Sequence, residues 1–401
     1  MLIVQKYGGT SMGDCDRIRN VAQRVIQSKV QGNTLVIVVS AMSGETDRLI
    51  GFAQHFTPLP NTKEMDMLLS SGERITAALL AIALESMGVK AISLSGRGAG
   101  IITDNFHTKA RIEYIDTTKI FHFLNEGYVV VVAGFQGIST NGEVTTLGRG
   151  GSDLSAVALA GALNADKCEI YSDVDGVYTT DPRIVKEARK LEKISYDEML
   201  ELASMGAKVL LNRSVELAKK LNVKLLCASS FTQSEGTLIT KEEDIMEKPI
   251  VSGVALDKNQ ARVSLADVLD RPGIAADIFG LLADNNINVD MIVQTIGRDG
   301  KTDIDFTIPK TEISLVQQVL EKFKDDFGNI EYDNNIAKVS IVGVGMKSHS
   351  GVASTAFKAL AEDNINIMMI STSEIKISMI ISIEFAQEAV RKLHSVYKLE
   401  Q

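Results

Sequence analysis

The chain has 401 residues and a formal net charge of −9, so we expect two or three domains and no nucleic-acid partner, which would require a basic face. The three cysteines show no CxxC spacing and the five histidines lie far apart, which argues against a zinc motif and is typical of thiols in a reducing compartment. No secretion signal or membrane-spanning run is apparent, so we expect a cytoplasmic protein with no membrane partner.

Apolar, β-branched runs alternate with helical patterns through the first part of the chain. Strands are expected at 2–4, 34–40, 89–94, 127–133 and 166–171, and helices at 16–31, 70–87 and 152–163. Continuous runs such as Val129–Val132 are typical of strands that are buried on both faces. The sequence therefore predicts an α/β domain over residues 1–245, with a mainly parallel sheet between two layers of helices.

A tandem repeat follows a charged stretch at 240–247. For example, Asp284–Val289 matches Glu362–Ile367. Each copy predicts strand, helix, strand, strand and helix, which fits a ferredoxin-like βαββαβ unit. We place the first repeat at 262–334 and the second repeat at 336–401.

The second repeat is short of one strand, because only Tyr397–Gln401 remain after its last helix. An unused strand pattern lies before the first repeat, at 250–257. A sheet edge without this strand would leave backbone groups unpaired. We therefore predict that residues 250–257 complete the second repeat and that the first repeat is inserted within it.

Three polar, glycine-bearing segments follow predicted strands: Lys6–Ser11, Thr145–Asp153 and Ser172–Arg183. Glycines let backbone N–H groups approach phosphate oxygens, and a helix start, here with Ser152 as its expected N-cap, favours anions. The carboxyl ends of parallel strands are where such sheets bind ligands. The chain has no GxxxxGK[ST] motif and no HRD or DFG loop, so a P-loop enzyme and a protein kinase are excluded.

Several of these residues also have simpler interpretations. Glu73 could form a capping box with Ser70 or bind a substrate ammonium group, and spacing alone leaves both open. Lys208 alone reads as an ordinary solvated lysine. Asp173 and Asp175, at the end of a strand, could organise Mg²⁺ or lysines around a phosphoryl group, or form a simple Asx turn.

Six segments, in this order along the chain, resemble aspartate kinase, a member of the amino-acid kinase family: Lys6–Ser11, Ser40–Met42, Ser71–Arg74, Gly134–Gly137, Thr145–Asp153 and Ser172–Arg183. The tandem repeat resembles the paired ACT domains of that family. The resemblance implies a carbamate-kinase-like, three-layer αβα sandwich followed by two ACT domains. No homoserine dehydrogenase segment follows Gln401, which is expected of a monofunctional form.

The implied activity is ATP-dependent, Mg²⁺-assisted phosphorylation of L-aspartate to 4-phospho-L-aspartate, which leads to lysine, threonine, methionine and diaminopimelate. The resemblance assigns catalysis to Lys6, Asp173 and Lys208. It assigns ATP binding to Lys6, Tyr7, Gly8, Gly9, Ser40, Ser172, Asp173, Tyr178, Thr179, Asp181, Pro182, Arg183 and Lys208. It assigns aspartate binding to Thr46, Glu73, Arg149, Gly150, Gly151 and Ser152. Mg²⁺ would be carried mainly by the ATP phosphates, and its protein ligands are unknown.

Feedback by lysine, threonine or both is implied by the ACT pair. The matching effector positions are Asp270, Gly273, Ile274, Ala275, Asp290, Gln294, Val352, Ala353, Asn366, Ile367 and Ser373. Ala353 stands where relatives often have threonine, so the identity of the effector stays open. The implied assembly is a homo-oligomer, a dimer or higher, or an α₂β₂ complex with an ACT-only chain that could start at Met246.

Two other functions compete with aspartate kinase. Another member of the family, such as a glutamate or acetylglutamate kinase, is disfavoured by the ACT pair and by Ser71–Arg74. A catalytically inactive amino-acid sensor should have lost a key charge, yet Lys6, Glu73, Arg149, Asp173 and Lys208 are all present.

Overall fold

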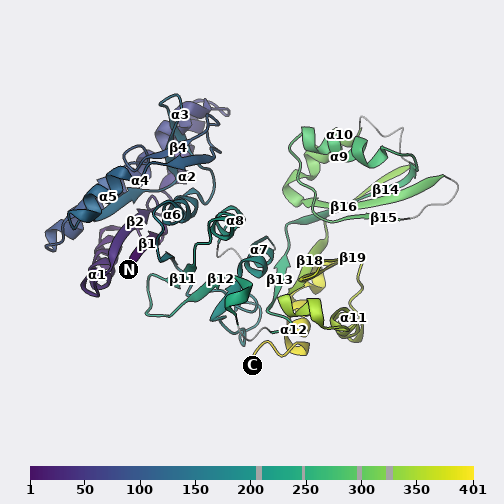
Figure 1. Ribbon diagram of the computed structural model, residues 1–401. Helices are drawn as coiled ribbons and strands as arrows, with labels where there is room; N and C mark the ends of the chain where they lie inside the picture. Colours follow the sequence, from purple (N-terminus) through teal and green to yellow (C-terminus); the bar gives the residue numbers. More distant parts are fainter. Residues whose placement is uncertain (205–209, 246–248, 296–299, 322–327) are drawn as a thin grey trace. The chain divides into compact units, whose positions relative to one another are not determined.

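Among the described residues, eight strands form the central sheet of the first part of the chain, in the order β10-β12-β11-β9-β1-β2-β6-β3 (Figure 1). The computed structural model describes residues 1–401 except 205–209, 246–248, 296–299 and 322–327. The six strands from β11 to β3 run parallel, whereas β12 is antiparallel to β11. The strands are β1 Leu2–Tyr7, β2 Thr34–Val39, β3 Ala91–Leu94, β6 Val129–Ala133, β9 Lys167–Ser172, β10 Lys193–Ser195, β11 Leu225–Ser229 and β12 Thr237–Thr240.

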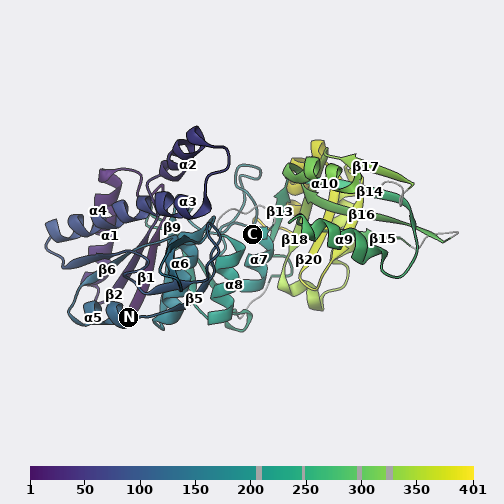
Figure 2. The same cartoon turned by 90° about the horizontal axis from the view of Figure 1, so that it is seen from above.

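Helices cover both faces of this sheet (Figure 2). On one face, α1 (Cys15–Val30) and α4 (Ser71–Ser86) pack on alternate strand residues such as Leu35 and Val129. On the other, α6 (Gly151–Ala162) contacts β1, β2 and β9, and α8 (Asn212–Leu221) packs on α6. Burial of both faces explains the unbroken apolar runs, and the predicted αβα sandwich is confirmed.

A small sheet that the sequence analysis did not predict lies in the same part of the chain, in the order β5-β4-β7-β8. Its strands have three or four residues, too short for a clear alternation: β4 Ile101–Thr103, β5 Ile112–Ile115, β7 Gln136–Ser139 and β8 Val144–Thr146. The helices α2 Glu45–Phe56, α3 Thr62–Leu69, α5 Thr118–Asn125 and α7 Tyr196–Ser204 were not predicted either. The small sheet matters because β8 leads directly into Leu147–Gly150.

Within the described residues, one helical stretch, Thr62–Ser86, is long and apolar enough to cross a membrane, which corrects our expectation that no run reaches this length. The stretch comprises α3 and α4. In its most apolar segment of 18 residues, 50% is buried inside the structure. Its buried residues include the polar Glu73 and Thr76, so the stretch packs inside the first part of the chain as a core helix does.

The two repeats form two four-stranded antiparallel sheets. The first has the order β15-β16-β14-β17 and the second has the order β13-β18-β20-β19. β13 therefore forms the edge of the second sheet beside β18, just as β17 forms the edge of the first sheet beside β14. The first repeat contains β14 Gln260–Leu269, α9 Ile274–Asp284, β15 Ile292–Gln294, β16 Lys301–Pro309, α10 Ile313–Leu320 and β17 Asn329–Asp333. The second contains β13 Gly253–Asp257, β18 Ile336–Val342, α11 Val352–Glu362, β19 Met369–Thr372, β20 Lys376–Ser382 and α12 Ala386–Val396.

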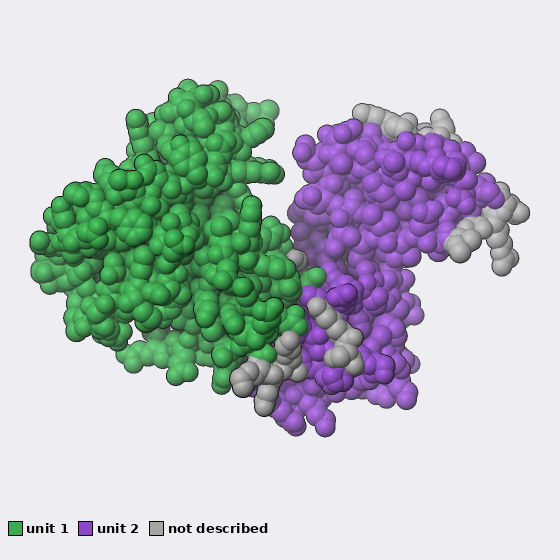
Figure 3. All heavy atoms as spheres, viewed as in Figure 1, with its two compact units in different colours: residues 1–177, 190–204, 208–246 green, residues 178–189, 205–207, 247–401 purple. Residues whose placement is uncertain are grey.

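The chain forms two compact units, and the segment 178–189 belongs to the unit of the repeats (Figure 3). Thr179 explains this placement: its carbonyl accepts a hydrogen bond from Val254 N–H at 2.7 Å, and its hydroxyl lies 2.9 Å from Nε2 of His394. Val185 is buried in the core of the second repeat. The first unit holds 1–177, 190–204 and 208–246.

Candidate active site

The loop after β1 is held against the ends of β2 and β9. Gly8 N–H donates to the carbonyl of Tyr171 at 3.0 Å, and Ser43 N–H donates to the carbonyl of Gly9 at 3.1 Å. A side chain on Gly9 would place its Cβ 3.0 Å from the carbonyl oxygen of Ala41, which is closer than an ordinary contact, so the position favours glycine. Two of the three predicted loops, with the turn after β2, therefore meet at one edge of the sheet.

Lys6 lies at this edge, and its Nζ atom forms an ion pair with Asp153 at 2.6 Å. Both side chains are largely buried, with exposed fractions of 10% and 13%. Asp153 lies in the first turn of α6, where a carboxylate is stabilised by the helix dipole. Asp153 lies in the predicted Thr145–Asp153 motif, but the resemblance predicts that Asp173 organises the lysine. The structure instead places Asp153 against Lys6, whereas Asp173 is exposed at the end of β9.

The start of α6 differs from the prediction. The helix begins at Gly151, its N-cap is Gly150 in a left-handed conformation (φ 68°), and no described side chain caps it. Ser152 is therefore not the N-cap but a buried residue of the first turn. Gly151 N–H donates to the carbonyl of Gly148 at 2.9 Å, but no described side chain caps the N–H groups that follow it. Uncapped N–H groups at a helix start are suited to binding an anion.

Glu73 is almost fully buried near the turn after β2. Its Oε1 accepts a hydrogen bond from Ala41 N–H at 3.1 Å, and among the described residues Oε2 has no hydrogen-bond partner. Ser70 does not form the capping box, since its hydroxyl donates to the carbonyl of Met67. Burial raises the pKa of Glu73 to about 7. A buried carboxylate oxygen without a partner is suited to receive an ammonium group.

Arg149 is exposed between two glycines of positive φ, Gly148 at 79° and Gly150 at 68°. The loop that carries it is fixed by Arg213, which donates to the carbonyls of Leu147 and Ala110 at 2.8 Å each. Arg213 was not predicted from the sequence, because its position on α8 carries no local signal. The guanidinium of Arg149 is thus presented on an anchored loop of the first unit.

The remaining predicted residues fall into three groups. Tyr7, Ser40, Thr46 and Ser172 belong to the first unit with Lys6. Tyr178, Thr179, Asp181, Pro182 and Arg183 belong to the second unit, where Arg183 forms an ion pair with Asp181 at 2.7 Å. Lys208 lies outside the described residues, as does Met246. Within the described parts of the chain, no group of three or more His, Cys, Asp or Glu side chains could hold a metal ion.

The second repeat contains a cavity of about 480 Å³. Three predicted effector residues, Val352, Ala353 and Ser373, line it, together with Met346, His349, Gly351, Thr372, Glu374 and Ile377. Asn366 and Ile367 are not part of this lining. The structure therefore gathers only some of the predicted effector positions of this repeat.

The predicted positions of the first repeat do not share that cavity. Asp290 forms an ion pair with the buried Lys338 of the second repeat. Gly273 is the left-handed N-cap of α9, followed by the buried Ile274 and by Ala275. Asp270 and Gln294 are exposed.

The parallel αβα sandwich with its glycine loops, followed by two ferredoxin-like repeats, defines a class of protein: a kinase of the amino-acid kinase fold with two ACT domains. The amino acid kinase family matches residues 1–229, and ACT domains match 262–328 and 339–397. The chain is 67% identical to the aspartokinase of Helicobacter pylori, with 100% of both chains covered. It belongs to the aspartokinases of the amino acid kinase family, as the sequence predicted, and is an aspartate kinase.

Solved structures agree with this assignment. Aspartokinase III of E. coli in complex with aspartate and ADP, in the R-state, is 27% identical, with a TM-score of 0.83 and 99% of both chains covered. The same enzyme in complex with lysine and aspartate, in the T-state, is 27% identical, with a TM-score of 0.80, 98% of this chain covered and 99% of the other.

Proposed function

We propose that the enzyme transfers the γ-phosphoryl group of ATP to the side-chain carboxylate of L-aspartate and forms 4-phospho-L-aspartate. The observation that carries this proposal is Lys6, a buried cation between a glycine loop and the start of α6. The similar E. coli enzyme binds aspartate and ADP. The residues present fit a nucleotide, since the Gly8–Gly9 loop offers close backbone approach to phosphate oxygens.

The chemistry needs no general base. The attacking carboxylate has an ordinary pKa of about 3.9, so it is ionised at pH 7. The main barrier is the repulsion between this anion and the phosphates. Lys6 and the N–H groups at the start of α6 offset that repulsion and stabilise the transferring group. Mg²⁺, carried by the ATP phosphates, would neutralise further charge there.

Two side chains would hold aspartate by its α-groups. The unpaired Oε2 of Glu73 would accept hydrogen bonds from the α-ammonium group. The guanidinium of Arg149 would bind the α-carboxylate through two parallel hydrogen bonds. With both ends held, the side-chain carboxylate is left to attack. Thr46, Gly150, Gly151 and Ser152 complete the proposed aspartate site.

The nucleotide residues keep their proposed roles. In the first unit these are Lys6, Tyr7, Gly8, Gly9, Ser40, Ser172 and Asp173. In the segment of the second unit they are Tyr178, Thr179, Asp181, Pro182 and Arg183. Lys208 is proposed as a second catalytic cation.

Hydroxylamine trapping tests the reaction. With ATP and Mg²⁺, purified protein should yield aspartyl hydroxamate and negligible glutamyl or acetylglutamyl hydroxamate. The variant Lys6→Met should abolish the product while Lys220→Met, at an exposed position of α8, should not. If no hydroxamate forms with any of these acids, the result would support an inactive sensor and reject the proposal.

We also propose feedback by lysine, threonine or both through the ACT domains, at the first step toward lysine, threonine, methionine and diaminopimelate. The cavity at Val352, Ala353 and Ser373 supports an effector site. The E. coli enzyme binds lysine in its T-state. Kinase activity should fall when lysine, threonine or both are added. If none of these three titrations lowers the activity, the proposal of feedback is wrong.

We propose domain limits of 1–245, 262–334 and 336–401, the last completed by 250–257, in a cytoplasmic protein. The pairing of β13 with β18 supports these limits, and the free thiols of Cys15, Cys168 and Cys227 support a reducing compartment. We propose assembly as a homo-oligomer or as α₂β₂. Light scattering measures the mass, and expression of Met246→Leu tests whether a short second chain starts at that residue.

A further inference from the structure

A buried carboxylate links α3 to the loop that carries Arg149. Asp66 is fully buried on α3. Its Oδ1 accepts a hydrogen bond from the hydroxyl of Thr146 at 2.5 Å, and both carboxylate oxygens accept from Thr108 N–H at 3.1 Å. Thr146 is the last residue of β8, three residues before Arg149. A helix residue thus holds the strand end from which this loop begins.

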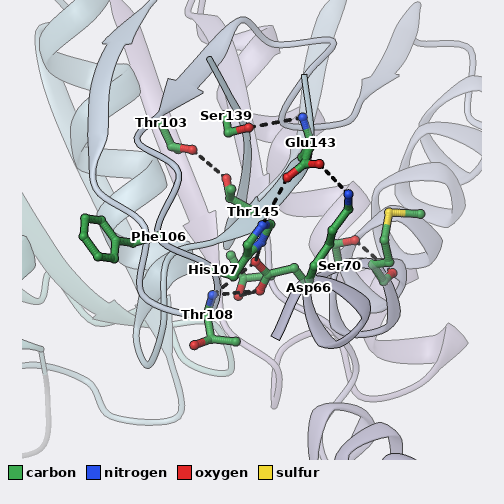
Figure 4. Close-up of polar contacts among 12 residues, drawn as sticks. Asp66, Ser70, Thr103, Phe106, His107, Thr108, Ser139, Glu143 and Thr145 are labelled. Atoms are coloured by element: carbon green, nitrogen blue, oxygen red, sulfur yellow. Dashed lines mark hydrogen bonds and ion pairs between the residues drawn. The ribbon is translucent and has the colours of Figure 1, made fainter. Parts of the chain in front are cut away.

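A second contact clamps the other end of β8. His107 lies between Asp66 and Glu143 (Figure 4), with Nδ1 at 2.7 Å from Asp66 and Nε2 at 3.3 Å from Glu143. Glu143, just before β8, also pairs with Lys63 of α3. Lys63 and Asp66 are three residues apart and share a helix face. One face of α3 therefore holds both ends of the three-residue strand.

The same carboxylate stabilises a strained backbone beneath the loop. Thr108 has a left-handed conformation, with φ of 66°, which is costly for a β-branched residue. Its carbonyl oxygen would lie 3.2 Å from a Cβ at Gly148. The hydrogen bonds from Thr108 N–H to Asp66 keep this conformation in place. Asp66 therefore supports the loop from below as well as at its start.

On its other side, α3 is joined to Glu73. The carbonyl of Ser70, between α3 and α4, accepts a hydrogen bond from the side-chain amide of the buried Gln136 at 2.8 Å. Glu73 follows in the first turn of α4. Glu73 lies seven residues after Asp66, about two helical turns. Asp66 thus contacts the supports of the Arg149 loop directly, and the chain that runs from α3 into α4 links it to Glu73.

We propose that Asp66, through Thr146 and Thr108, is a positioning residue that sets the distance between Glu73 and Arg149 and so determines the affinity for aspartate. This inference rests on the proposed roles of those two residues. Binding one amino acid at both its α-groups requires the two partners at a set separation, and a misplacement of about 1 Å can cost on the order of 100-fold in rate. Asp66 would have little influence on ATP binding, because its contacts lead to the aspartate groups.

The test uses the full-length enzyme and three variants. Thr146→Val removes the hydroxyl at constant volume, Thr146→Ser retains it, and Asp66→Asn removes the charge at constant shape. We expect Thr146→Val to raise the aspartate KM about tenfold and Asp66→Asn to raise it further, with the ATP KM changed less than about twofold. Thr146→Ser should behave like the wild type, which is the rescue that a hydroxyl-dependent contact predicts.

Two results would overturn the proposal. One is an unchanged aspartate KM in folded Thr146→Val, even if its melting temperature falls, because that pattern describes a purely structural contact. The other is an equal rise of both KM values. If Asp66→Asn does not fold, the comparison of Thr146→Val with Thr146→Ser is sufficient to test the proposal.

Parallel variants separate this inference from the proposed function. If Arg149→Ala and Glu73→Gln leave the aspartate KM unchanged, the assignment of the aspartate site is wrong. If both raise it and Thr146→Val does not, only the role of Asp66 fails.

Discussion

Lys6 at the end of β1 and Asp153 in the first turn of α6 form an ion pair of 2.6 Å in a largely buried position. The pair joins the glycine loop to a helix start that can bind anions. A lysine with four rotatable side-chain bonds is mobile unless a partner orients it. We therefore expect Asp153 to direct the Lys6 ammonium group toward the transferred phosphoryl group.

Replacement of Asp153 by asparagine should lower kcat about 100-fold, because the oriented cation is lost from the transition state. The aspartate and ATP KM values should change much less. A coupled assay of ADP formation measures this. Asp197→Asn is a matched control, since Asp197 pairs with Lys219 on the surface at 2.5 Å. Wild-type kcat in Asp153→Asn would show that the ion pair is only structural.

Aspartate use should depend on pH through Glu73. Burial raises the pKa of this carboxyl group to about 7, so it is protonated in the free enzyme below that pH and ionised above it. Only the ionised form attracts the α-ammonium group. We expect kcat/KM for aspartate to rise with pH and level off above about pH 7. In Glu73→Gln, kcat/KM for aspartate should be low and should not change with pH across this range. A pH dependence like that of the wild type in this variant would assign the titration to another group.

The same group should destabilise the free enzyme at high pH. The pKa of Glu73 is raised from 4.5 to about 7, so its stabilising contribution is present below pH 4.5 and is lost as pH rises through 7. A shift of this size corresponds to roughly 3 kcal/mol. Glu73→Gln should therefore raise the melting temperature at pH 8 more than at pH 5. Calorimetry without ligands measures both, and an equal effect at the two pH values would contradict the buried charge.

Arginine at position 149 should be irreplaceable by lysine. Lysine keeps the charge but cannot form two parallel hydrogen bonds to a carboxylate. We expect Arg149→Lys to raise the aspartate KM about tenfold or more and to leave the ATP KM within about twofold. Arg19→Lys, in an exposed ion pair, serves as the control. Equal changes in the two KM values would reject the assignment of Arg149 to aspartate.

Gly134 should tolerate no side chain. A Cβ there would lie 2.9 Å from the carbonyl oxygen of Val39 and 3.0 Å from Cβ of Ser152. Gly134→Ala should destabilise the enzyme by about 1–3 kcal/mol, because backbone atoms cannot move aside cheaply. Urea unfolding measures this. Gly51→Ala, on α2 with no atom within 4 Å, should be neutral or slightly stabilising.

The predicted alternation of strands and helices was confirmed where apolar runs are long, as at β2 and β6, because burial on both faces leaves an unmistakable pattern. The small sheet was missed because β4 and β8 have only three residues each. Ser152 was expected as an N-cap from residue type, yet the helix begins earlier, since Gly150 can adopt a positive φ. Such choices depend on backbone conformation rather than on composition.

The sequence alone determined the family, the parallel sheet, the tandem repeat and the segments from which the site is built, because these follow from periodicity and local motifs. Only the tertiary structure decided which carboxylate meets Lys6, that Glu73 has an unpaired oxygen, and that Asp66 joins α3 to the loop of Arg149. The physical reason is that these contacts join residues between 32 and 147 positions apart along the chain. Their partners are selected by packing, for which no local pattern exists.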